Sequence, residues 1–166
     1  MSEARFAVAT FVYLAHADGH TPDDADLAAH CAAVAAAEDA GAGDAAGEAL
    51  VSRVEALLAD ADVATVLGQL FGESLRTDLG EGSRDDRLHR IRAYQFSRGQ
   101  PWLATIYERR EDGTVAPSTV LVERVTDLVR VMDPNPWDDV PEDRALPTGD
   151  FLVLWELAGC PGYAIA

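Results

Sequence analysis

The chain has 166 residues, a pI near 4.4 and a net charge of −16, because 29 acidic residues oppose 13 basic ones, all of them arginine. A field of this sign repels phosphate backbones, so the charge argues against nucleic acid as a partner. No apolar run approaches the ~20 residues of a membrane span, which argues against a membrane partner as well.

The first part of the chain, about residues 1–98, is predicted to be helical because apolar residues recur there at helical spacing. Thr21 and Pro22 predict a helix start, with Thr21 as N-cap. That helix places Cys31 on a core-facing apolar stripe, and residues 40–47 form a Gly/Ala-rich connection. The other four predicted helices cover residues 3–16, 46–60, 62–75 and 85–96, the last with Leu88, Ile91 and Phe96 as its apolar positions.

The second part, residues 99–166, changes to a strand pattern. Prolines at 134, 136, 141 and 147 predict a following stretch without regular structure. We therefore expect an α+β fold in one domain over 1–166, with a helical N-terminal half packed on a small antiparallel sheet. The predicted elements are strands at Leu103–Arg109, Val120–Val125 and Leu128–Met132, a helix at 150–158, and an edge strand at Tyr163–Ile165.

The two cysteines, Cys31 and Cys160, are too few for a disulfide framework, and we expect a reduced pair in a cytoplasmic protein. The apolar residues 6–14 are read as a first helix and not as a signal peptide, because the segment is short and preceded by Glu3. Two explanations of the acidity stay open: GC-rich codon usage, or a salt-loving host. No cofactor motif or Cys/His zinc set is present, so no cofactor is expected.

Short motifs between residues 99 and 156 have a recognisable order. Gly99 and Pro101 precede a strand, Asp133-Pro134 follows a later strand, and Phe151 and Trp155 lie four residues apart in the last helix. This order resembles the C-terminal half of papain-like cysteine peptidases of the bacteriocin-processing branch. The resemblance implies a papain-like fold, with Asp133 as the residue that would orient a catalytic histidine.

The catalytic residues of that family are incomplete here. The resemblance would place the histidine near Pro117–Val120, where Ser118 and Thr119 cannot act as bases near neutral pH. Cys31 is the candidate nucleophile, but it lies inside its helix and not at the N-terminus, where the dipole favours a thiolate. Cys160, with His89, is a second candidate for a rearranged site.

A second resemblance concerns the N-terminal segment. The run Ala15-His16-Ala17-Asp18-Gly19 before an acidic helix start is similar to TerB-like helical proteins, in which nearby acids collect metal. That resemblance implies a mixed oxygen and nitrogen ligand set. The alternative is a helix C-cap followed by an N-cap, with no metal. The weak candidate ligands are His16, Asp18, His20, Asp23 and Asp24.

A proline-rich run at 133–139 combines a stiff backbone, an aromatic side chain and three carboxylates. One hypothesis is a recognition loop in which Trp137 anchors a partner while Asp138 and Asp139 select a basic one. The alternative is a crossover whose tryptophan covers the sheet.

Three functions follow from the sequence. The first is a non-catalytic papain-like domain that binds a peptide or protein, basic in character, through the sheet edge and the 133–139 loop. The second is an active cysteine peptidase or acyltransferase that uses Cys31 or Cys160. The third is a TerB-like metal-responsive module at Asp18–Asp24. The oligomeric state stays open.

Overall fold

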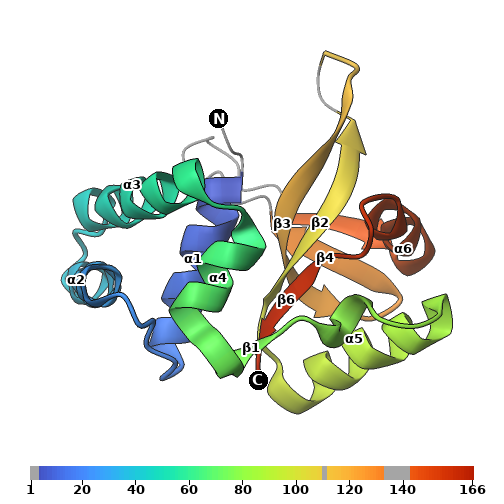
Figure 1. Cartoon of the computed structure of the whole chain (residues 1–166), viewed down its shortest axis with the longest axis horizontal. Helices are drawn as coiled ribbons and strands as arrows, with labels where there is room; N and C mark the ends of the chain where they lie inside the picture. Colours follow the sequence, from blue (N-terminus) through green and yellow to red (C-terminus); the bar gives the residue numbers. More distant parts are fainter. Residues whose placement is uncertain (1–3, 110–111, 133–142) are drawn as a thin grey trace. The chain divides into compact units, whose positions relative to one another are not determined.

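A computed structural model describes residues 4–109, 112–132 and 143–166. It confirms the α+β class (Figure 1). The chain divides into two compact units: a helical unit, Met1–Leu75 with Ile165–Ala166, and a sheet unit, Arg76–Ala164. This division falls before the fifth helix and not at residue 98, where the sequence period changes, so that helix belongs with the strands.

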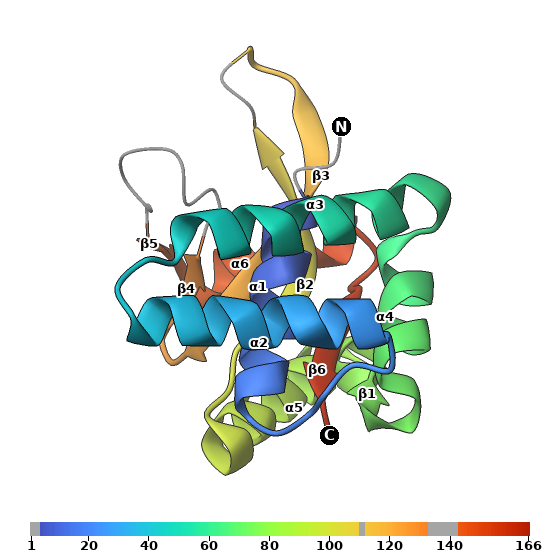
Figure 2. The ribbon, with the colours of Figure 1, turned by 90° about the vertical axis from the view of Figure 1, so that its left-hand side faces the viewer.

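The helical unit contains four α-helices in the described part of the chain. Helices α2 and α3 lie side by side (Figure 2), and the rings of Phe11 and Phe71 meet edge to face with centroids 6.0 Å apart. None of the described helices has the length and hydropathy of a membrane span. The elements are α1 (Ala4–Ala17), α2 (Ala25–Asp39), α3 (Asp44–Asp60), α4 (Val63–Phe71) and the 3-10 helix η1 (Gly72–Ser74).

Helix α2 begins later than the sequence predicted. Asp24, not Thr21, is the N-cap, because its Oδ1 accepts the Leu27 N–H at 3.0 Å. The backbone of the preceding residue bonds to helix α4, since the Asp23 N–H donates to the Leu70 carbonyl at 2.9 Å. The prediction of a helix start at Thr21–Pro22 was therefore wrong, and a tertiary hydrogen bond explains the difference.

The sheet unit contains helices α5 and α6, and the sheet has the strand order β1-β6-β2-β3-β4-β5. The pairings of β2 with β3 and β6, and of β4 with β3 and β5, are antiparallel. The elements are β1 (Leu75–Arg76), the 3-10 helix η2 (Asp78–Gly80), α5 (Arg84–Arg98), β2 (Trp102–Arg109), β3 (Val115–Val125), β4 (Leu128–Met132), β5 (Asp143–Pro147), α6 (Thr148–Leu157) and β6 (Gly162–Ile165).

Two strand predictions need correction. The proline-rich stretch ends in strand β5, and Pro147 is the last residue of this strand. Strand β5 is also the last strand in the sheet order. A missing N–H is tolerated at such a position. Strand β6 is not at the edge of the sheet, because the two-residue strand β1 follows it.

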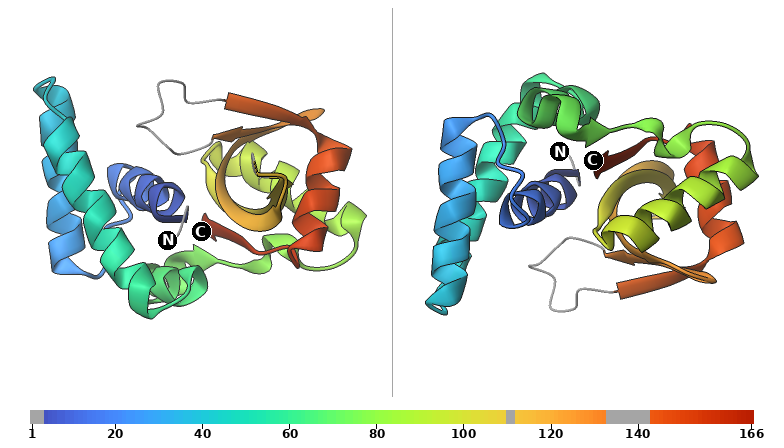
Figure 3. Two further views of the ribbon diagram at one scale, coloured as in Figure 1. Left: turned by 90° about the horizontal axis from the view of Figure 1, so that it is seen from above. Right: turned by 90° about the horizontal axis from the view of Figure 1, so that it is seen from below.

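The core of the sheet unit lies where α5 and α6 pack against the strands. Trp102, Phe151 and Trp155 form an aromatic cluster with ring centroids 5.4–6.2 Å apart. Tyr94 is the buried aromatic residue of α5, whereas Phe96 is 95% exposed, contrary to its predicted apolar role. The strands curl when seen end-on (Figure 3), and Arg144 of β5 accordingly donates to Glu108 of β2.

Candidate functional site

Cys31 is a core residue of the helical unit. It lies inside α2 with no exposed surface, on the stripe that also buries Leu27 and Val34. Burial raises the pKa of its thiol from 9.0 to about 11, and no charged group contributes to this shift. Because the thiolate is the nucleophile, Cys31 lacks the activation that a cysteine peptidase needs.

We expect Cys31 to react slowly in the folded protein. A thiol pKa near 11 leaves about a hundredfold less thiolate than one near 9 at the same pH. Its labelling by iodoacetamide should therefore be at least ~100-fold slower in native than in urea-unfolded protein. The thiol ionises at lower pH in the unfolded chain, so the free energy of unfolding should fall as pH rises from 9 to 11.

Peptide mapping of the labelled cysteine measures the rate, and chemical denaturation at several pH values measures the slope. Cys31→Ala is the control, since it should reduce the slope between pH 9 and 11. Equal labelling rates in native and unfolded protein would contradict the buried, neutral thiol.

Cys160 lies in the turn between α6 and β6, and its backbone has a φ of +56°. The residue is buried against Gly80, where an added Cβ would meet the Cys160 carbonyl oxygen at 1.9 Å. Burial raises the pKa of its thiol, while the neighbouring Arg87 lowers that pKa and Glu156 raises it again. No histidine contributes to this shift, so the predicted pairing of Cys160 with His89 gains no support.

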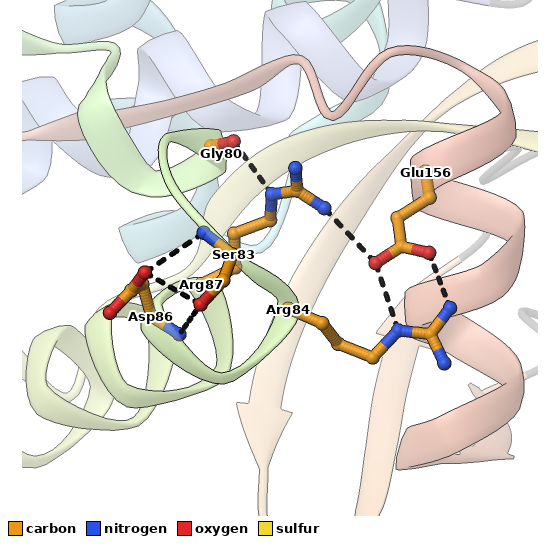
Figure 4. A network of polar contacts seen from close by, with 6 residues as sticks. All are labelled: Gly80, Ser83, Arg84, Asp86, Arg87 and Glu156. Atoms are coloured by element: carbon orange, nitrogen blue, oxygen red, sulfur yellow. Dashed lines mark hydrogen bonds and ion pairs between the residues drawn. The ribbon is translucent and has the colours of Figure 1, made fainter.

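A charged network next to Cys160 joins α5 to α6 (Figure 4). Glu156 of α6 accepts from Arg84 Nε at 2.9 Å and from Arg87 Nη1 at 3.0 Å. Arg87 Nε also donates to the Gly80 carbonyl at 2.9 Å. The two guanidinium groups, Arg84 first, lower the pKa of Glu156, so the carboxylate stays ionised. Both guanidinium groups bond the one carboxylate of Glu156, which indicates a structural clamp between the two helices.

The start of α5 is fixed in the same region. Ser83 and Asp86 form a reciprocal capping box, in which the Ser83 hydroxyl accepts the Asp86 N–H and Asp86 accepts the Ser83 N–H. Figure 4 shows this box in the same turn of α5 that carries Arg84 and Arg87. A second ion cluster, in which Asp78 accepts from Arg76 and Arg90, holds η2 against α5.

The other positions implied by the papain-like resemblance either lie in strand β3 or fall outside the described residues. Ser118 and Thr119 lie in β3, and the Thr119 hydroxyl is 3.3 Å from that of Thr105 in β2. Four predicted site residues lie outside the described residues: Asp133, Trp137, Asp138 and Asp139.

The candidate metal ligands near the end of α1 are all described. Asp24 is engaged on both oxygens, by the Leu27 N–H and by Arg53 Nη2 at 3.2 Å. Among the described residues, no group of three or more His, Cys, Asp or Glu side chains could hold a metal ion. His16, Asp18, His20 and Asp23 therefore do not combine with Asp24 into such a site, and the cap explains the acid at position 24.

The charge is divided unequally between the two units, a feature that the overall composition does not reveal. The helical unit has 13 of the 29 acidic residues but only two of the 13 arginines, for a net charge of −11. Both arginines are already engaged: Arg5 bonds Glu55 at 2.7 Å, and Arg53 bonds Asp24. The sheet unit carries the other 11 arginines and a net charge of −5.

Strands β2 and β3 extend past the rest of the sheet as a two-stranded ribbon (Figure 1). They pair from Trp102↔Val122 to Arg109↔Val115. Among the described residues, β4 pairs with β3 from Leu121 onward, and β6 pairs with β2 at Leu103 and Ala104. The outer part of the ribbon therefore has strand edges that no other described strand covers.

Comparison with protein-family models, with curated proteins and with solved structures gave no match to this chain.

Proposed function

We propose that this chain is a non-catalytic, cytoplasmic domain on a papain-like scaffold that binds a cationic peptide or protein. The observation that carries the proposal is the charge of the helical unit, 13 acidic residues against two arginines that are already paired. Such a surface attracts cationic partners and speeds their association at low ionic strength.

The state of the thiols supports a binding role over catalysis. Cys31 is buried with a raised pKa, and Cys160 is held in a buried turn beside the ion pairs of Glu156, also with a raised pKa. A cysteine peptidase needs a thiolate beside a base, and no histidine affects the pKa of either thiol. Two free, buried thiols also suit a reducing compartment.

The proposal is tested by the binding of an arginine-rich peptide, measured by fluorescence anisotropy over a range of salt concentrations. In the helical unit, four exposed acids that form no ion pair with another described residue are neutralised together: Asp39→Asn, Asp44→Asn, Glu48→Gln and Asp60→Asn. We expect this variant to bind the peptide about tenfold more weakly at low salt, with the difference shrinking as salt screens the charges.

A matched variant separates a local surface from overall charge. It neutralises four exposed acids of the sheet unit, and so has the same net charge: Glu81→Gln, Asp85→Asn, Asp127→Asn and Asp150→Asn. We expect the affinity of this control for the peptide to fall by less than about threefold. Equal losses of peptide affinity in the two variants, or no binding of the peptide by the wild-type protein, would refute the proposal.

A further inference from the structure

Helix α6 is apolar on its outward face as well as on its core face. The core face consists of the buried side chains of Phe151, Leu152 and Trp155. On the opposite face, Val153 is 44% exposed and Leu157 is 65% exposed, and their spacing of four residues places them on one side of the helix. The helix packs on β2, β4 and β5, and Figure 3 shows it at the rim of these strands. Val153 and Leu157 therefore lie on the side of α6 that the strands do not cover.

Few charged side chains interrupt this outward face. Among the ten residues of α6, only Asp150 and Glu156 are charged. Glu156 is directed toward α5, where Arg84 and Arg87 bond its carboxylate, so it does not lie over the apolar stripe (Figure 4). A surface helix normally carries polar side chains on the face away from its core, and a helix that is apolar on both faces is normally buried on both. The outward face of α6 thus has the character of a contact surface.

The charged groups at the two ends of the stripe fit a second copy of the same helix. Asp150, in the first turn, makes no hydrogen bond or ion pair with another described residue. At the other end, Arg84 donates to Glu156 through Nε and Nη2, which leaves its Nη1 without a bond to any described residue. When two α6 helices lie antiparallel about a two-fold axis beside Val153, Asp150 of one copy comes level with Leu157 of the other. A carboxylate without a partner then lies next to a free guanidinium N–H group, twice per pair of copies.

We propose that two copies of this chain form a dimer through the outward faces of their α6 helices. Val153 and Leu157 of both copies form one apolar seam, and an ion pair between Asp150 and Arg84 lies at each end of it. Helix α6 is about 15 Å long, so the contact is at the small end of specific interfaces. We therefore expect a weak dimer, with a dissociation constant on the order of 10–100 μM.

The salt dependence of the dimer should be opposite to that of cationic peptide binding. Each copy has a net charge of −16, so two copies repel each other at long range. Salt screens this repulsion, whereas the apolar seam does not depend on it and exposed ion pairs contribute little. The dissociation constant of the dimer should therefore fall at least about threefold from low to high salt.

Sedimentation velocity over a series of protein concentrations, at low and at high salt, measures the dimer. Leu157→Asp places a carboxylate in the seam of both copies and should raise the dissociation constant at least about tenfold. Phe96→Asp is the matched control, because it makes the same change of charge at an exposed apolar residue of α5. We expect this control to change the dissociation constant by less than about threefold. Thermal melts check that both variants are folded.

Crosslinking tests the antiparallel arrangement. Val153→Cys puts a thiol near the two-fold axis, so a short bismaleimide should join two copies of this variant, whereas Phe96→Cys should stay uncrosslinked. The native thiols of Cys31 and Cys160 are buried and do not compete. A protein that stays monomeric at high salt would overturn the proposal and leave the face to a different partner. Equal weakening by the two aspartate variants, or crosslinking at position 96 in place of 153, would also overturn it. None of these results bears on peptide binding by the helical unit, so the two proposals can fail separately.

Discussion

Gly80→Ala is expected to destabilise the sheet unit by about 3 kcal/mol, at the upper end of the usual cost of overpacking. A Cβ at this position would lie 1.9 Å from the Cys160 carbonyl oxygen and 2.9 Å from the Cys160 Cβ. The carbonyl belongs to a tight turn with positive φ at Cys160, so it cannot move without rearranging the approach to β6. Urea denaturation of wild type and variant measures the difference in unfolding free energy.

Gly68→Ala is the matched control for this substitution. Gly68 lies within α4, and an added Cβ would meet nothing within 4 Å. Alanine is favoured over glycine inside a helix, so this variant should gain about 0.5–1 kcal/mol. A Gly80→Ala variant as stable as wild type would show that the Gly80–Cys160 contact is not tight in solution.

Trp155→Ala should cost about 3–5 kcal/mol, because it opens a cavity in the aromatic cluster of the sheet unit. Trp155 is fully buried against Trp102 and Phe151, with ring centroids 5.4 Å and 5.8 Å away. Its Nε1 also donates to the Pro161 carbonyl at 2.8 Å, which holds the turn before β6. The cost is measured by denaturation monitored through far-ultraviolet circular dichroism.

Two conservative variants separate packing from this hydrogen bond. Trp155→Phe and Trp102→Phe remove a similar volume from fully buried positions. The Trp102 Nε1, however, has no hydrogen-bond partner in the described structure. Trp155→Phe should therefore be the more destabilising by about 0.5–1.5 kcal/mol, since it removes one of the two donors to the Pro161 carbonyl, the other being the Thr105 N–H. Equal losses of unfolding free energy in the two variants would mean that the hydrogen bond to Pro161 makes no net contribution to stability.

Local signals predicted most of the helices and strands. The acids around position 85 predicted the start of α5, because the capping box of Ser83 and Asp86 depends on residues three apart. The alternation of Leu103–Arg109 predicted β2 within one residue of its observed start. These predictions succeeded because periodicity and capping act over a few residues.

Long-range contacts account for the errors. Spacing placed Phe96 among the apolar positions of α5, but the strands cover the side of the helix that holds Ile91 and Tyr94 and leave Phe96 in water. The bond from the Asp23 N–H to the Leu70 carbonyl moved the start of α2. Residues 47 positions apart make this bond, and no short window of sequence contains it.

The sequence by itself determined the α+β class, the acidity and the burial of Cys31, because composition and periodicity report on charge and on helix faces. Tertiary structure decided three further features. It put 11 of the 13 arginines in the sheet unit and joined Arg84 and Arg87 to a carboxylate about seventy residues away. It also limited the pairing of β6 with β2 to Leu103 and Ala104 among the described residues. Ion pairs and strand pairing depend on which residues, distant in the sequence, come into contact. Only the folded chain defines these contacts.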